Sequence, residues 1–269
     1  CVSVERIEEE LSKLLAAPAP AAYLDEKILG VILPELTPEA LAAAKPIVDA
    51  CPAGAENLPV RLAALLVSLG EAGTRRTLKR LRCSNALIEE TAVLVKEWKG
   101  SSGSFSEDIL EVGPRREALG RDWSPGLSEE EAAAAPNGLM MPTEIRGRAE
   151  EKAPGTPDSL SLTIYARRLL GKYDLKTVQR IAALGTAMQP ERAADLAALS
   201  KLAEQMEADG VCCRISQLAV NGRDLMTAGI PAGPGLRHAL EALLDGVICE
   251  KYPNERQNLL AAAREFSAS

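Results

Sequence analysis

The sequence predicts an all-α protein, and both its composition and its patterning indicate this. Hydrophobic residues make up 46% of the 269 positions, yet aromatic residues account for only 3%. Alanine and leucine, which favour helices, are abundant, whereas the aromatic and β-branched residues that favour strands are scarce. Apolar residues recur at spacings of three and four, the period of a helix with one buried face. The length exceeds one typical compact domain, so we expect more than one module.

The first third of the chain carries several helix boundaries. Ser3 can cap a first helix, whose apolar positions are Val4, Ile7, Leu11, Leu14 and Leu15. Prolines at 18 and 20 close it. A short apolar piece over 28–33 stops at a proline, and Thr37-Pro38 opens the next helix with a threonine cap and proline at the first helical position.

Residues 59–99 show the strongest helical pattern of the first half. We expect Gly70 and Gly73 to break a first leucine-rich helix, because glycine disfavours helix interiors. A second helix is predicted from about Thr74 to Arg82, and a third from about Asn85 to Trp98.

Residues 100–157 differ in character, because roughly a third of them are Gly, Pro or Ser and no apolar period lasts beyond two turns. This composition predicts a flexible, poorly ordered acidic insert. Beyond it, apolar spacing predicts two helices between 160 and 184, then a long helix from Ala193 to Met206 that ends at Gly210. A helix, a hairpin and two further helices are expected over 215–266.

The predicted helix at 74–82 is strongly basic. Five cations spread over one broad side of it, while Leu78 and Leu81 face the other; they are Arg75, Arg76, Lys79, Arg80 and Arg82. Residues 58–100 carry eight Lys or Arg against four Asp or Glu, a local charge of +4 in a chain of net charge −7. Such a side is either an ordinary solvated face or a site that binds the phosphates of a nucleic acid.

A glycine-rich turn near the C-terminus is the second candidate site. Asp224 is expected to cap a helix that ends at Gly229, and a hairpin with Gly233 and Gly235 then leads into a new helix. Glycines let backbone amides approach a phosphate closely at a helix N-terminus, as in helix-hairpin-helix nucleic-acid modules. The alternative is a plain turn between packed helices.

Reaction chemistry is not apparent in the sequence. The six cysteines have no CxxC spacing and there is one histidine, His238, so neither a zinc set nor a Cys/His or Ser/His nucleophile is predicted. His238 is expected on the surface. No Gly-rich phosphate loop or paired-aspartate motif for two metals is found. Without a signal peptide or a long apolar run, we expect a cytoplasmic protein with reduced thiols and no membrane partner.

Several segments, in order, resemble the parts of one protein family. Residues 2–15 are similar to its neck motif, and residues 32–36 to the link after it. Residues 61–66 and 78–85 resemble its body. The most specific match is 218–226 continuing through 229–234, which resembles the start of the tail, and 254–263 resembles its closing helix. The family that these segments resemble is that of the bacterial (class II) CCA-adding tRNA nucleotidyltransferases and poly(A) polymerases.

The resemblance implies an elongated array of helical neck, body and tail domains. Its expected parts are a neck remnant (1–36), a helical body that is RNA-binding, SrmB- or HD-like (37–99), the insert (100–157), a continuation of the body (158–214) and the tail (215–269). The neck residues Glu5, Arg6 and Glu10 would brace a nucleotide template. The body and tail would hold the tRNA acceptor arm and elbow through phosphates, which carry little base information.

The residues expected to contact RNA are those of the basic helix (Arg75, Arg76, Lys79, Arg80, Arg82) and of the tail (Asn221, Gly222, Arg223, Gly229, Gly233, Gly235). The catalytic head of the family, with its magnesium-binding aspartates, precedes the neck motif, so this chain is expected to bind no cofactor and to be inactive alone. Its start at Cys1 hints at an upstream truncation, and a head encoded upstream would be its partner besides tRNA.

Two other functions compete with this reading. A stand-alone helical interaction module could keep the fold and lack RNA binding, which the acidic insert and the net charge of −7 favour. A His-Asp metal phosphohydrolase is disfavoured, because Val67-Ser68 stands where many relatives have His-Asp.

Overall fold

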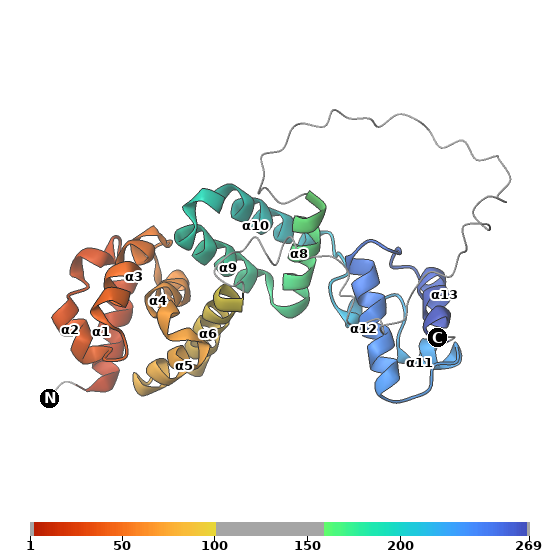
Figure 1. Ribbon diagram of the computed structural model, residues 1–269, viewed down its shortest axis with the longest axis horizontal. Helices are drawn as coiled ribbons and strands as arrows, with labels where there is room; N and C mark the ends of the chain where they lie inside the picture. Colours follow the sequence, from red (N-terminus) through yellow and green to blue (C-terminus); the bar gives the residue numbers. More distant parts are fainter. Residues whose placement is uncertain (1–2, 101–158, 268–269) are drawn as a thin grey trace, which may run out of the picture.

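The computed structural model describes residues 3–100 and 159–267, and in these two stretches the fold is entirely helical, which confirms the predicted all-α class. Figure 1 shows an elongated molecule, with α1–α6 at one end, α8–α10 in the middle and α11–α13 at the other end. The predicted insert, apart from Gly100 at the end of α6, lies outside the described residues.

The first stretch holds six α-helices that end near the predicted positions. They are α1 (Val4–Ala16), α2 (Glu26–Ile32), α3 (Pro38–Ala50), α4 (Leu58–Leu66), α5 (Gly70–Arg80) and α6 (Asn85–Gly100). The predicted caps form: the hydroxyl of Ser3 accepts from the amide of Arg6, and that of Thr37 accepts from the amide of Ala40. Each such bond satisfies an amide that the first helical turn leaves unpaired.

The expected break at Gly70 and Gly73 is wrong in its position. A short 3₁₀ turn over Val67–Leu69 makes the break, and α5 starts at Gly70 and continues through Gly73. Gly70 has φ of 69°, which suits glycine at the corner. A Cβ on Gly73 would lie 2.8 Å from the Cβ of Leu69, so glycine here allows a close approach and does not end the helix.

The second stretch contains α8 (Ser159–Lys172), α9 (Leu175–Met188), α10 (Ala193–Ala208), α11 (Gly222–Thr227), α12 (Pro234–Ile248) and α13 (Arg256–Ser267). Gly210 follows α10 with φ of 63°, the left-handed conformation that commonly ends a helix. The helices expected in this half are therefore present.

Two separate hydrophobic cores stabilise these helices. The first runs from Leu11 to Cys213 and unites α1–α6 with α8–α10; the second runs from Cys212 to Ala263 and unites α11–α13. Helix α4 is central to the first core, since all its residues from Pro59 to Leu66 are buried. Because a helix buried on all sides shows no polar face, its central position was not visible in the periodicity.

Arg61 is the one charged residue of α4, and its side chain is 2% exposed. Its guanidinium donates to the carbonyls of Leu15 at 2.5 Å and Cys51 at 3.0 Å, and also to that of Ala17. These carbonyls lie at the C-terminal ends of α1 and α3, where the backbone has no hydrogen-bond donors left for them within the helix. Arg61 therefore joins three helices in the core.

Candidate nucleic-acid interface

The basic helix α5 has one buried side and one charged side, as the sequence predicts. Thr74, Thr77 and Leu78 are buried, and Leu81, which follows the helix, is 3% exposed. The five cations of this segment differ in their surroundings, however, and three of them are paired with carboxylates from elsewhere in the chain.

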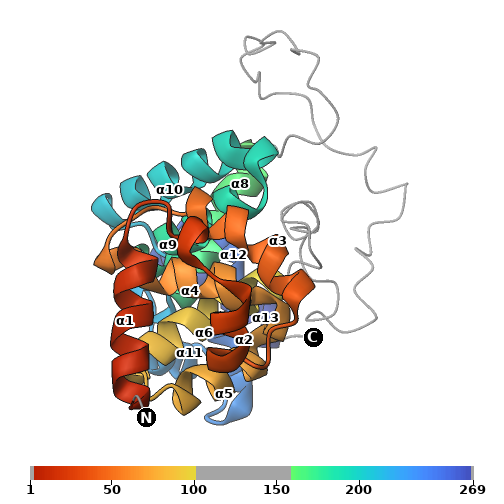
Figure 2. The same cartoon turned by 90° about the vertical axis from the view of Figure 1, so that its left-hand side faces the viewer.

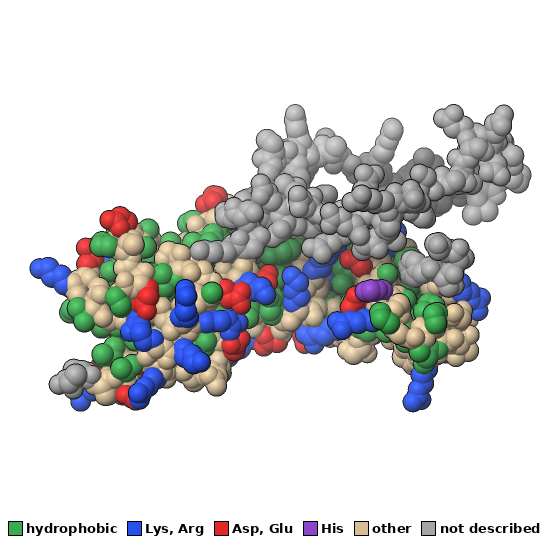
Figure 3. All heavy atoms as spheres, turned by 60° about the horizontal axis from the view of Figure 1, so that its bottom comes forward, with side chains coloured by type: hydrophobic (Ala, Val, Ile, Leu, Met, Phe, Trp, Pro, Cys, Tyr) green, Lys and Arg blue, Asp and Glu red, His purple; other side chains and the backbone are tan. Residues whose placement is uncertain are grey.

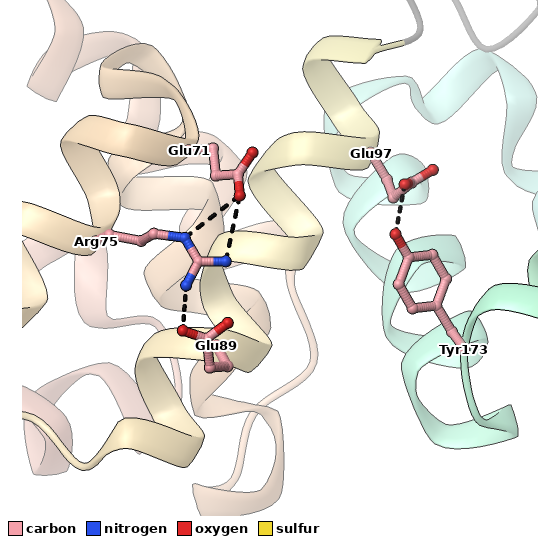
Figure 4. A network of polar contacts seen from close by, with 5 residues as sticks. All are labelled: Glu71, Arg75, Glu89, Glu97 and Tyr173. Atoms are coloured by element: carbon pink, nitrogen blue, oxygen red, sulfur yellow. Dashed lines mark hydrogen bonds and ion pairs between the residues drawn. The ribbon is translucent and has the colours of Figure 1, made fainter.

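Arg75 is held between two carboxylates (Figure 4). Its Nε and Nη2 donate to Glu71 Oε1 at 3.3 and 3.2 Å, and its Nη1 donates to Glu89 of α6. The hydrogen bond to Glu89, followed by that to Glu71, raises the pKa of Arg75. Arg75 therefore joins α5 to α6.

A second contact of α6 is drawn in the same view. The hydroxyl of Tyr173 donates to Glu97 Oε1 at 2.6 Å and connects α6 to the end of α8.

Arg80 and Arg82 connect the end of α5 to α2 and α1. Arg80 donates to both carboxylate oxygens of Glu35, each at 2.9 Å, and to the carbonyl of Ile32 at 2.8 Å. Arg82 pairs with Glu5 of α1. Arg82 also has φ of 59°, a left-handed conformation that is uncommon outside glycine. The mutual repulsion expected of five cations on one side is therefore largely relieved within the chain itself.

Arg76 and Lys79 are the two cations of α5 that remain exposed without a carboxylate partner in the described parts of the chain. They are three positions apart, so they are neighbours on one face of the helix. Two exposed charges of the same sign at this spacing attract an anion without first breaking an internal ion pair. These two cations could not be separated from Arg75, Arg80 and Arg82 by sequence, because Glu89, Glu35 and Glu5 pair with those arginines from 14, 45 and 77 positions away in the chain.

The glycine-rich turn joins α11 to α12. The side chain of Asn221 caps α11 and accepts from the amides of Arg223 and Asp224, at 2.9 and 3.2 Å, while the Asp224 carboxylate accepts from the amide of Asn221. The expectation that Asp224 caps this helix is therefore corrected: Asn221 is the cap, and Asp224 completes a reciprocal capping box.

The glycines of this turn leave its backbone accessible. Gly229 and Gly233 have φ of 103° and 144°, which other residues rarely adopt, and Gly235 lies in the first turn of α12. At all three, nothing lies within 4 Å of the place where a Cβ would be. Arg223 at the start of α11 is exposed, whereas a Cβ on Gly222 would lie 3.3 Å from the side chain of Leu236, so glycine there allows close packing. Pro234 has no amide proton and the amide of Leu236 donates to the carbonyl of Gly233 at 3.1 Å, so Gly235 is the residue of this first turn that can offer an amide to an anion.

The two candidate regions lie on the same side of the molecule. In Figure 1, α5 and the turn between α11 and α12 are both at the lower edge. Figure 3 brings this edge forward and shows Lys and Arg side chains distributed along its length, with Asp and Glu among them. A single extended polyanion could therefore contact both regions.

An apolar groove lies between α1 and α2, which face the viewer in Figure 2. The groove encloses about 290 Å³ and is bordered by Arg6, Glu10 and Tyr23. Three large hydrophobic residues at this end are strongly exposed: Tyr23 (72%), Ile28 (60%) and Val31 (81%). Glu5 points to Arg82 instead; a backbone hydrogen bond, then Arg82, lowers the pKa of its carboxyl. The structure thus separates Glu5 from Arg6 and Glu10.

Metal-binding and nucleophilic groups are not assembled in the described residues. No three His, Cys, Asp or Glu side chains of these stretches come together as a metal site. His238 is exposed on α12, as expected. Burial raises the pKa of the Cys51 thiol to about 12 and that of Cys83 to about 11, so both stay protonated near neutral pH. None of the helices described here is long and apolar enough to cross a membrane.

The described residues form an all-α array with a glycine turn between α11 and α12 and two exposed cations, Arg76 and Lys79, on α5. Residues 161–263 match the family model of tRNA nucleotidyltransferase domain 2, putative. Over this C-terminal region the chain is similar to the tRNA nucleotidyltransferases, which supports the resemblance to the CCA-adding family seen in the sequence. Searches among curated proteins and among solved structures returned no match.

Proposed function

We propose that this chain is the tRNA-binding portion of a CCA-adding tRNA nucleotidyltransferase. Its body and tail hold the acceptor arm and elbow of tRNA through phosphates, while a catalytic head outside this sequence transfers CMP and AMP. The observation that carries the proposal is the arrangement of the Arg76 and Lys79 pair on the same side of the molecule as the glycine turn of the family-matched region.

Phosphate contacts fit the requirement of such a protein. A maturation enzyme acts on every tRNA, so its grip has to be indifferent to sequence, and phosphates are the same in all of them. Arg76 and Lys79 supply charge from the body, and the turn with Gly229, Gly233 and Gly235 supplies backbone amides from the tail. The ion-paired Arg75, Arg80 and Arg82 act mainly in holding α5 in place.

The experiment is titration of tRNA at several salt concentrations with two matched double variants of α5. Arg76→Ala with Lys79→Ala removes two free cations and should flatten the slope of log affinity against log salt by up to ~1.4–1.8, at ~0.7–0.9 per phosphate contact. Arg75→Ala with Arg80→Ala removes the same charge from paired positions. It should lower the thermal midpoint and leave the salt slope nearly unchanged.

Gly235→Asp tests the turn separately. A carboxylate at the start of α12 would repel a phosphate there, so we expect weaker tRNA binding and a slope change of about one contact or less. Nothing within 4 Å opposes the added Cβ, so the fold should survive, which circular dichroism checks. Equal tRNA binding by the parent and all three variants would contradict the proposal.

The head would be held at the α1–α2 groove in this proposal. Arg6 and Glu10 of the neck motif border the groove, and the exposed Tyr23, Ile28 and Val31 form the kind of apolar surface that another protein surface covers. The described residues do not fit a magnesium site, so Mg²⁺ would be held in the head. Purified chain with tRNA, CTP, ATP and Mg²⁺ should accordingly incorporate no nucleotide above background.

A helical interaction module without RNA binding is the second candidate. The internal pairing of Arg75, Arg80 and Arg82 favours it, because each paired cation is less available to a polyanion. The same exposed apolar end would then bind a protein partner. Absence of tRNA binding by the parent at low salt would support this candidate over the first.

A further inference from the structure

The two cores meet at a junction made of arginines. Two neighbouring cysteines are buried in different cores here: Cys212 in the second core and Cys213 in the first. Helix α8 of the first core also lies against α12 of the second. At this contact α8 presents Arg167 and Arg168, and their side chains reach the C-terminal end of α12.

Arg167 binds the end of α12 directly. Its Nη1 donates to the carbonyls of Val247 at 3.3 Å and Ile248 at 3.1 Å, and its Nη2 donates to Glu250 Oε1 at 2.9 Å. Terminal carbonyls of a helix lack partners and carry partial negative charge, so a cation is favoured there. Only 15% of the Arg167 side chain is exposed, which limits competition from water.

Arg168 and Arg214 complete the junction. Arg168 Nη2 lies 3.2 Å from Asp245 Oδ1 of α12. In the connecting segment, Arg214 donates to the carbonyls of Leu170 at 3.0 Å and Tyr173 at 3.1 Å, at the end of α8. The backbone also approaches closely here, because a Cβ on Gly171 would lie 2.6 Å from the carbonyl oxygen of Cys213.

Glu250 supplies a second, independent sign of this contact. It follows α12 with φ of 57°, a left-handed conformation that glycine adopts without strain and that is strained in other residues. Glycine would fit this conformation without strain, whereas the glutamate found here has its carboxylate bonded to Arg167. Beside this pair lies a pocket of about 530 Å³, bordered by Val211, Tyr252 and Asn254, so the junction is not closed by dense apolar packing.

We propose that Arg167 and Arg168 are positioning residues that fix the second core, and with it the glycine turn, at one orientation relative to Arg76 and Lys79. The consequence for RNA rests on the proposed function, because a fixed spacing matters to binding only when one ligand contacts both cores. Two contact regions held at the right spacing bind one ligand more tightly than the same regions held loosely.

The first experiment measures orientation without RNA. Donor and acceptor dyes are placed on unnatural amino acids that replace the exposed Glu204 of α10 and Gln257 of α13, and single-molecule energy transfer is recorded. The parent should give one narrow distance distribution, and Arg167→Met with Arg168→Met should give a broad one. Arg237→Met is the control, because Arg237 pairs with Glu241 within α12 alone. A distribution unchanged in the double variant overturns the proposal.

Glu250→Gly separates positioning from stability. It removes the partner of Arg167 and relieves the left-handed strain, so the thermal midpoint should not fall while the distance distribution broadens. This variant therefore tests the proposal even when the double arginine variant folds poorly. A narrow distribution in Glu250→Gly, with the midpoint retained, would count against the proposal.

The second experiment measures tRNA affinity. We expect both junction variants to bind tRNA about tenfold more weakly, since a loosened linkage lowers the effective concentration of the second contact region. The slope of log affinity against log salt should change by less than one contact, because no phosphate contact is removed. A slope reduced by about two contacts would mean that Arg167 and Arg168 touch RNA themselves, which overturns the positioning role. Should the parent bind no tRNA, the proposed function fails, and the distance distributions still decide the junction.

Discussion

The guanidinium of Arg80 binds the carboxylate of Glu35 through two hydrogen bonds of 2.9 Å, although 45 positions separate the two residues in the chain. This pair and the bond from Arg80 to the carbonyl of Ile32 hold α5 against the end of α2. A residue that the sequence offers as a phosphate ligand thus also connects two helices of the first core.

Arg80→Ala should therefore act on folding more than on RNA. The side chains of Arg80 and Glu35 are 43% and 35% exposed, so water screens the pair. We therefore expect a loss of only about 0.5–1 kcal/mol in the free energy of unfolding. A double-mutant cycle with Glu35→Gln in urea denaturation measures the coupling. Arg76→Ala is the control and should leave the unfolding free energy within about 0.5 kcal/mol. Additive effects of the two substitutions would show that the pair contributes nothing.

The same pair predicts that part of the stability of the fold depends on pH. The hydrogen bond from Arg80 is the largest cause that lowers the pKa of the Glu35 carboxyl. A carboxyl with a lowered folded-state pKa stabilises the fold above its unfolded pKa, about 4.3, and loses this contribution as pH falls through the folded value. The difference in thermal midpoint between the parent and Glu35→Gln should be constant from pH 8 to 5, and it should shrink toward zero below about pH 4. A difference that grows on acidification would contradict this.

Arg61 should be among the most sensitive positions of the first core. Arg61→Leu leaves the buried carbonyls of Leu15, Ala17 and Cys51 without their donor, and each unpaired buried carbonyl costs about 1–3 kcal/mol. We expect a total loss of roughly 3 kcal/mol or more in urea denaturation. Arg61→Lys, which keeps a charge and a donor, should lose less. Wild-type stability in Arg61→Leu would show that the carbonyls find other partners.

Two glycines inside helices should respond to alanine with opposite signs. Gly30 of α2 is exposed and has nothing within 4 Å of a prospective Cβ, so Gly30→Ala should stabilise the fold by about 0.5–1 kcal/mol. A Cβ on Gly73 would lie 2.8 Å from the Cβ of Leu69, so Gly73→Ala should destabilise. Differential scanning calorimetry on both variants tests this, and a rise in both midpoints would contradict the packing described for α5.

Local residue patterns predicted most of the helices. Ser3 and Thr37 lie at their expected caps because a hydroxyl bonds an amide three positions ahead, and the apolar face with Leu78 and Leu81 follows from the helical period. The errors at Gly73 and Asp224 arose where a neighbour decides the outcome. Leu69 sets the role of Gly73, and Asn221 takes the cap that Asp224 could have formed.

What the sequence determined by itself is the all-α class, the family resemblance of the C-terminal region and the residues from which an RNA-binding surface can be drawn, since these depend on composition, period and local motifs. Only the tertiary structure decided which cations are free. Ion pairing acts over a few ångströms in space, and Glu5, Glu35 and Glu89 reach α5 from distant points in the chain. For the same reason Arg76 and Lys79, rather than all five cations, are left to meet a phosphate, and Arg167 and Arg168 became visible only where α8 meets α12.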